Sequence, residues 1–231
     1  MGKALKQNQK QPKRILIGSP SLDGRVDAWF CFAVQELSKQ GIFSNIDFSI
    51  SLLSYESILP MARNELLMQA IQGNFDGLLF LDSDVYCNPG AILEIIASDK
   101  DVVNVPTVKK TDVERYDISF QGIPEPAEWL KAETVSTSCL YLSKKALTAL
   151  DQNSSQIVFR DKPLKNICQY DFAGGAFIGE DIYLCHKLKT LGFDIWVNTN
   201  STCMHIGPKV YTGNFRKMLE DVNQSQQRSN A

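Results

Sequence analysis

Short apolar runs alternate with longer stretches of helical periodicity along the middle of the chain. The apolar runs, which predict buried strands, cover residues 14–19, 46–53, 77–81, 101–105, 134–142 and 193–197. The amphipathic stretches, which predict helices, cover residues 26–39, 61–72, 89–97, 143–150 and 179–191. Repeated strand-then-helix order is typical of an α/β protein with a mainly parallel central sheet flanked by helices. Such a sheet binds its ligands beyond the carboxyl ends of its strands.

Polar segments mark the limits of this predicted core. Residues 1–13 and 220–231 are polar and predict flexible tails, which leaves residues 14–219 as a single domain. Residues 106–131 are rich in proline, glycine and charge, and residues 151–178 are similar. We expect both stretches to be loops or insertions over the functional edge of the sheet.

Composition narrows the class of protein. Of the 231 residues, 44% are hydrophobic and 22% are charged, and the net charge of −2 provides no global basic field for nucleic acid. A local basic surface is still open to Lys109, Lys110 and Lys209 with Arg216 and Lys217. Six cysteines without a CxxC pair indicate free thiols in a reducing compartment. Without an apolar leader or a bilayer-length apolar run, a cytoplasmic location is expected, which for a viral or phage protein is the host cytoplasm.

The strongest chemical signal is a pair of aspartates directly after the most apolar predicted strand. Asp82 and Asp84 follow the run Leu78–Leu81, so they should lie at the edge of the sheet that binds ligands. Alternation along an extended chain points both side chains the same way. Carboxylate oxygens in this arrangement suit Mg²⁺ or Mn²⁺ bridging a diphosphate. Two solvated acids at a strand end are the alternative reading.

Two further signals lie at the starts of predicted helices. Arg63 and Asn64 fall in the first turn of one helix, where free N–H groups and a forked guanidinium can hold a phosphate. Glu180 and Asp181 open another helix, where one of them can serve as general base for a hydroxyl group. The helix dipole alone also favours acids in a first turn, and the spacing does not choose between these readings.

A histidine in a loop near the end of the predicted domain completes the set. His205 follows the last predicted strand, within the segment CMHIGPK, and is a candidate third metal ligand. Lys209, four residues later, can neutralise a phosphate. The other histidine, His186, lies inside a predicted helix, and a structural role is expected for it.

Together these segments resemble a known family. The run PMARNELLMQAIQGNFDGLLFLDSDV (residues 60–85) resembles the glycosyltransferase family 2 pattern of an ARN-bearing helix, an apolar strand and DxD. GEDIYLCHKLKTLGFDIWVN resembles the later "ED" helix of that superfamily, and MHIG resembles its metal-binding histidine. The resemblance covers about residues 14–210 in order and spacing. The compact chain also resembles stand-alone GT-A enzymes of large DNA viruses and bacteriophages.

The resemblance implies a GT-A, or Rossmann-like, nucleotide-diphospho-sugar transferase fold and a role for each matching residue. Asp84 and His205 would ligate Mn²⁺ or Mg²⁺, and Asp82 would reach the donor ribose or a metal-bound water. The implied donor contacts are Pro20, Asp23, Arg63, Asn64 and Lys209, and the implied acid–base residues are Asp181 with Glu180. The loop at residues 53–56 departs from the family because it lacks the usual acidic signature.

The implied activity is transfer of a hexosyl or pentosyl group from a nucleoside-diphosphate sugar, with a UDP-sugar favoured, to an acceptor hydroxyl. Inversion at the anomeric carbon is expected, with retention still open, and the acceptor is a glycan or a hydroxymethylated DNA base. One alternative is a haloacid-dehalogenase-like phosphatase, although that class carries its motif on the first strand and here two predicted strands precede it. The other is a nucleotide-sugar-binding module without turnover. The sequence does not indicate an oligomeric state.

Overall fold

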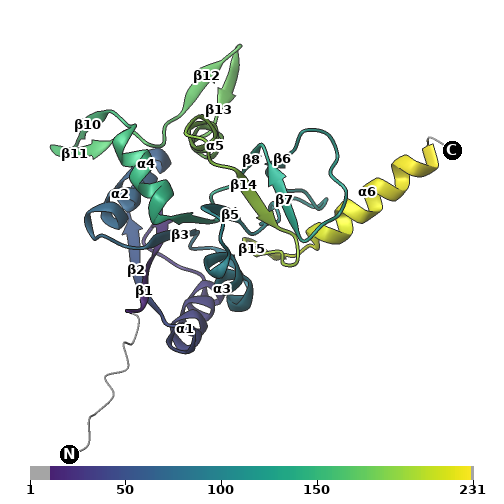
Figure 1. Cartoon of the computed structure of the whole chain (residues 1–231), viewed down its shortest axis with the longest axis horizontal. Coiled ribbons are helices and arrows are strands. Elements are labelled where there is room, and N and C mark those ends of the chain that lie inside the picture. The colour runs from purple at the N-terminus through teal and green to yellow at the C-terminus, as the bar shows by residue number, and fades with distance from the viewer. Residues whose placement is uncertain (1–10, 230–231) are drawn as a thin grey trace, which may run out of the picture.

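A seven-stranded sheet with helices on both faces forms the centre of the molecule (Figure 1). The computed structural model describes residues 11–229. The strand order is β2-β1-β3-β9-β5-β14-β7, and β9 and β7 run opposite to the other five strands. The strands are β1 (Lys13–Ser21), β2 (Ile46–Ser54), β3 (Gly77–Leu81), β5 (Val102–Asn104), β7 (Trp129–Ala132), β9 (Cys139–Ser143) and β14 (Ile195–Asn198). The sheet is therefore mostly parallel, as the sequence predicts.

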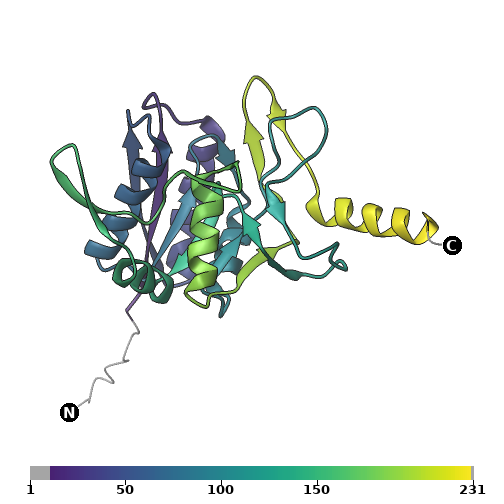
Figure 2. The same ribbon diagram turned by 90° about the horizontal axis from the view of Figure 1, so that it is seen from above.

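Five helices cover this sheet in two layers, which Figure 2 shows from above. Helices α1 (Ala28–Phe43) and α3 (Pro89–Ala97) pack on one face. Helices α2 (Leu59–Gln72), α4 (Lys144–Gln152) and α5 (Glu180–Thr190) pack on the other. Strand β3 contacts both layers, and all five of its residues are buried. Burial on both faces explains why this strand reads as a continuous apolar run.

One predicted strand is divided in two. Residues 134–142 form β8 (Thr134–Val135) and β9, with a break between them. The buried amide of Asn104 holds this break, because its Nδ2 donates to Ser136 O and to Cys139 O, each at 3.0 Å. The chain therefore leaves the small sheet of β6 (Ile118–Ser119) and β8 and enters the central sheet antiparallel to β3.

The stretch 151–178, expected as loop, forms two β-hairpins instead. The first pairs β10 (Gln156–Phe159) with β11 (Lys162–Lys165), and the second pairs β12 (Asp171–Ala173) with β13 (Ala176–Ile178). Figure 1 shows the second hairpin projecting from the body beside α5. Residues 106–131 likewise contribute β6 and the edge strand β7.

The C-terminal segment is helical rather than a tail as far as residue 229. Helix α6 (Phe215–Ser229) begins on the body and extends away from it (Figure 1). Its first turns are fixed because Phe215 and Leu219 are buried, and the Phe215 ring lies 4.8 Å from that of Tyr116. The expected N-terminal tail, up to residue 10, lies outside the described residues. None of the described helices combines the length and the apolar character needed to span a membrane.

Candidate active site

The predicted residues Asp82, Asp84 and His205 lie together at one edge of the sheet. Asp82 and Asp84 follow β3, and the chain continues as β4 (Val85–Tyr86). A small antiparallel sheet joins β4 to β15 (Met204–Ile206), and β15 pairs in turn with β16 (Val210–Tyr211). In this register His205 lies opposite Val85, and Ile206 N donates to Asp84 O at 2.8 Å.

Asp84 and His205 face each other across this pairing. His205 Nε2 lies 3.4 Å from Asp84 Oδ1, and His205 Nδ1 lies 3.1 Å from Val108 O. A carbonyl can only accept, so Nδ1 carries the proton in that contact, and Nε2 is the ring nitrogen that faces Asp84. A carboxylate and an oriented imidazole nitrogen are thus brought together as candidate metal ligands.

The lysine at this point is Lys110 and not Lys209. Lys110 Nζ lies 2.5 Å from Asp84 Oδ2. Burial alone would raise the pKa of Asp84, but hydrogen bonds from His205 and Lys110 lower this pKa to about 2. Lys209 pairs instead with the exposed Asp112 at 2.6 Å, so the structure does not bring it to Asp84.

Asp82 is paired with a buried guanidinium. Arg63 Nη2 lies 2.7 Å from Asp82 Oδ1, and the Arg63 side chain is only 2% exposed. The guanidinium also lies 4.8 Å from the centre of the Phe80 ring. Within residues 11–229, Nε and Nη1 of Arg63 make no hydrogen bond. Asp82 therefore offsets a buried charge. Within the part of the chain that the structure describes, its carboxylate does not form a three-ligand group with the Asp84 carboxylate and the His205 ring, which corrects the expectation that Asp82 is a metal ligand.

Asn64 has a different role from the one expected. Its side chain is fully buried, so it cannot touch a donor at the sheet edge. Its Oδ1 accepts from Ile167 N at 3.1 Å and Cys168 N at 2.7 Å, and its Nδ2 donates to Cys168 O at 2.9 Å. Asn64 thus fastens the segment between the first hairpin and the second to helix α2.

We expect Asn64→Leu to lower the free energy of unfolding by on the order of 3 kcal/mol, because it leaves two buried N–H groups and a carbonyl without partners. Urea unfolding measures this. Asn153→Ala is the matched control, because Asn153 makes a single exposed hydrogen bond to Ala149 O. If the two variants lost equal stability, the bridging role of Asn64 would be wrong.

Glu180 and Asp181 begin α5, with Gly179 as its N-cap. Burial raises the pKa of both carboxyl groups. The charge of Asp181 raises the pKa of Glu180 further, that of Asp117 raises the pKa of Asp181, and Arg63 lowers both. Asp181 Oδ1 accepts from Ile182 N at 2.8 Å, which fixes the carboxylate at the helix start. A carboxyl group with a raised pKa is better suited to accept a proton than a fully solvated one.

A cavity of about 650 Å³ opens beside the aspartates, at the carboxyl ends of β1 and β2. Its lining includes Pro20 and Asp23, both predicted from the sequence, together with Asp82 and Asp84. Glu56 also lines it, although no sequence motif pointed to a role for that loop. The Glu56 side chain accepts from Ile58 N at 2.9 Å and pairs with Arg160 at 2.8 Å.

Three cysteines lie behind this edge in the apolar core. Among the described residues, Cys87, Cys139 and Cys203 are the group of three or more potential metal ligands whose ligand atoms lie within 4.8 Å of one another. All six cysteines are free thiols, as expected from their spacing. Burial raises the pKa of Cys87 and of Cys203, so these thiols stay protonated and pack as small apolar groups.

Comparisons with known proteins bear on the fold. No protein-family model matches the sequence, and no curated protein matches it. The crystal structure of A197 from STIV is similar over 87% of this chain and 94% of its own, with a TM-score of 0.53 and 16% sequence identity. The chain has the GT-A fold.

Two other solved structures overlap more loosely with this chain. One is a glycosyltransferase involved in the glycosylation of the major capsid of PBCV-1, with 18% identity, a TM-score of 0.33 and coverage of 59% of this chain and 63% of its own. The other is a mannose-1-phosphate geranyltransferase from Thermus thermophilus, with 12% identity, a TM-score of 0.32 and coverage of 79% of this chain and 64% of its own. With TM-scores this low, neither likeness adds to the assignment of the fold.

Proposed function

We propose that the protein is a metal-dependent glycosyltransferase that moves a sugar from a nucleoside-diphosphate sugar to an acceptor hydroxyl, with inversion. The observation that carries this proposal is the convergence of Asp84 and His205, 3.4 Å apart, beside a cavity of about 650 Å³ at the carboxyl edge of the sheet. In open α/β sheets this edge is where nucleotides bind.

The side chains at this edge fit a divalent cation that the protein holds by only two groups. A carboxylate oxygen and an imidazole nitrogen suit Mn²⁺, with the remaining coordination positions open to a diphosphate and water. The Lys110 ammonium on Asp84 shows that this carboxylate attracts a positive charge. When bound, the cation would supply Lewis-acid stabilisation of the leaving diphosphate.

The other residues have separable tasks in this proposal. Arg63 holds Oδ1 of Asp82, and Asp82 lines the cavity where a donor ribose would lie. Pro20 and Asp23 line the part of the cavity that would receive the base, for which uracil remains our choice. Asp181 takes the proton of the acceptor hydroxyl as it attacks, and Glu180 lies beside it in the same helical turn.

Thermal unfolding with nucleotide sugars tests the proposal directly. A ligand that binds only the folded state raises its apparent stability, by about 2.7 kcal/mol at a hundredfold excess over Kd. We expect at least one nucleoside-diphosphate sugar to raise Tm in the presence of Mn²⁺ and to lose that effect in EDTA. Slow Mn²⁺-dependent hydrolysis of the same donor would exclude a binding module without turnover. If no nucleotide sugar raised Tm while an aryl phosphate was hydrolysed, the phosphatase alternative would replace the proposal.

The two lysines make the geometry testable. Lys110 lies on Asp84, and in this proposal it binds a phosphate oxygen of the donor beside the cation. We therefore expect Lys110→Met to weaken donor binding by about tenfold or more, because that charge-assisted contact is lost. Lys209→Met is the matched control, because Lys209 is exposed and paired with Asp112, and its loss should leave donor affinity unchanged. Calorimetric titration with UDP-sugar and Mn²⁺ compares them. The reverse order of effects would restore Lys209 to the role expected from the sequence.

A further inference from the structure

The hairpin of β12 and β13 carries three aromatic side chains that the reaction outlined above does not use. Its turn is Gly174–Gly175. Both glycines have positive φ, 59° and 80°, as the two central residues of a type I′ hairpin turn require. Phe172 pairs directly with Phe177 across the two strands. Tyr170 lies two residues before Phe172 and so points to the same face.

The three rings form one continuous row. The Tyr170 and Phe177 ring centres lie 5.3 Å apart, and those of Phe177 and Phe172 lie 5.6 Å apart. All three side chains are exposed, by 46% for Tyr170, 74% for Phe172 and 59% for Phe177. Aromatic rings exposed together usually mark a surface that contacts another molecule.

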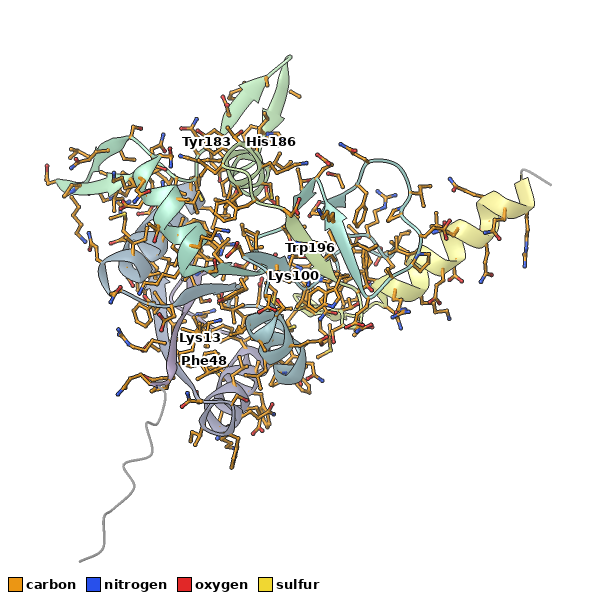
Figure 3. All side chains as sticks on the ribbon, in the orientation of Figure 1. Lys13, Phe48, Lys100, Tyr183, His186 and Trp196 are labelled. Atoms are coloured by element: carbon orange, nitrogen blue, oxygen red, sulfur yellow. The ribbon has the colours of Figure 1, made fainter. Side chains whose placement is uncertain are left out.

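The opposite face of the hairpin is turned toward the body of the protein. Asp171 and Ile178 line a cavity that Tyr183 and His186 of α5 also line. Figure 3 shows these two labelled α5 residues at the foot of the hairpin. The aromatic row therefore lies on the outward face and is not packing against α5.

The row begins beside the proposed catalytic carboxylates. Strand β13 ends at Ile178, and Gly179 alone separates it from Glu180 and Asp181. Burial, together with charge on those two acids, raises the pKa of the Tyr170 hydroxyl, so this hydroxyl lies within their electrostatic reach.

The charged residues of the hairpin restrict which class of molecule can bind to it. Residues 170–178 contain one acid, Asp171, and no lysine or arginine. A nucleic acid needs cations beside its phosphates, and an anionic membrane needs the same. A neutral carbohydrate needs neither, because the apolar C–H face of a pyranose ring stacks on an aromatic ring while its hydroxyls remain in water.

We propose that the outward face of this hairpin is the acceptor platform, and that it takes an uncharged oligosaccharide whose terminal hydroxyl is thereby placed at Asp181. This inference rests on the proposed function and narrows it, because it selects the glycan over the hydroxymethylated DNA base. The rings bind sugar units beyond the reacting one, so their loss should affect acceptor binding and leave donor binding alone.

Binding to an array of neutral oligosaccharides, with UDP and Mn²⁺ present, tests the platform. We expect the wild-type protein to bind a subset of these glycans and the double variant Phe172→Ala/Phe177→Ala to bind them on the order of tenfold more weakly or worse. Phe43→Ala is the matched control, because Phe43 is 91% exposed at the end of α1, and it should leave glycan binding unchanged. Donor-induced thermal stabilisation should be equal in all three proteins.

Each other result has a defined meaning. If the donor stabilises the wild type but no neutral glycan binds, or the double variant binds glycans as well as wild type, the platform proposal is overturned and the transferase proposal stands. If hydroxymethylated duplex DNA or phosphatidylcholine vesicles bind through the two phenylalanines instead, the carbohydrate assignment is wrong. If no nucleotide sugar stabilises the wild type, the proposed function itself fails.

Discussion

Asp181→Asn should lower turnover by about 10²- to 10⁴-fold, the range expected when a positioned general base is removed. Asparagine has nearly the same shape and can still accept the hydrogen bond from Ile182 N. It cannot take the proton of the acceptor hydroxyl. We therefore expect the loss in kcat, with donor binding almost unchanged, in a coupled assay that measures release of the nucleoside diphosphate.

The pH dependence and the stability of the same variant provide independent checks. Because burial raises the pKa of Asp181, kcat/KM of the wild type should fall as the pH is lowered through that pKa, and the variant should lack this limb. A raised pKa in the folded state means that ionisation costs stability as the pH rises through it. The neutral amide avoids that cost, so the variant should unfold at a temperature equal to or above that of the wild type at pH 7.

Asp194→Asn is the matched control for Asp181→Asn. Asp194 is exposed, pairs with Lys131 at 2.7 Å and precedes β14 at the opposite edge of the sheet. Turnover and its pH profile should stay as in the wild type. If Asp181→Asn also kept wild-type turnover, Asp181 would not be the base, and Glu180→Gln would then be the variant to measure.

Most strands of the central sheet, most helices and the positions of Asp84 and His205 could be predicted because their signals are local. The run Gly77–Leu81 is apolar throughout, and burial between two helical layers is the reason. The aspartates follow it directly, so the edge of the sheet on which they lie follows from the direction of the strand alone. His205 could be predicted because it follows the last strand of the sheet in sequence.

The roles of Asn64 and the two lysines depend on contacts between distant parts of the chain. Asn64 bonds to residues more than 100 positions away, and no pattern around residue 64 shows that Cys168 will be its partner. Lys110 reaches Asp84 across 26 positions from a loop whose path the sequence does not define. In the sequence Lys209 is the more obvious phosphate-binding candidate because it lies four residues after His205. In the structure it forms an ion pair with Asp112.

Short or weakly apolar elements escape sequence analysis for a related reason. The hairpin at residues 171–178 has strands of only three residues. Three positions are too few to show the alternation of apolar and polar residues that predicts a strand. Its signal is the glycine pair between two aromatic residues, which favours a tight hairpin turn. Helix α6 resembles a tail in sequence because its apolar positions are few. Its contacts with the body include buried Phe215 and Leu219 together with hydrogen bonds from Arg216 to Asn200 and from Asn223 to Pro124.

Asp84→Ala should abolish Mn²⁺-dependent donor binding, with a loss in affinity of more than about 100-fold. Even partners that merely orient a metal ligand are worth about 10- to 100-fold in metal affinity, and Asp84 is one of only two protein ligands in the proposed site. With Asp84 gone, His205 is held by Val108 O but has no carboxylate opposite it. Calorimetric titration of UDP-sugar with and without Mn²⁺ measures the loss.

Asp112→Ala provides the comparison that isolates this effect. Both aspartates pair with a lysine, Asp84 with Lys110 at 2.5 Å and Asp112 with Lys209 at 2.6 Å, but only Asp84 also faces His205. A general loss of acidic charge would therefore weaken donor binding in both variants, whereas loss of a metal ligand weakens it only in Asp84→Ala. Far-UV circular dichroism should be the same for both. Wild-type affinity for donor and Mn²⁺ in Asp84→Ala would remove the metal from the proposed reaction, because His205 alone cannot hold a divalent cation against water.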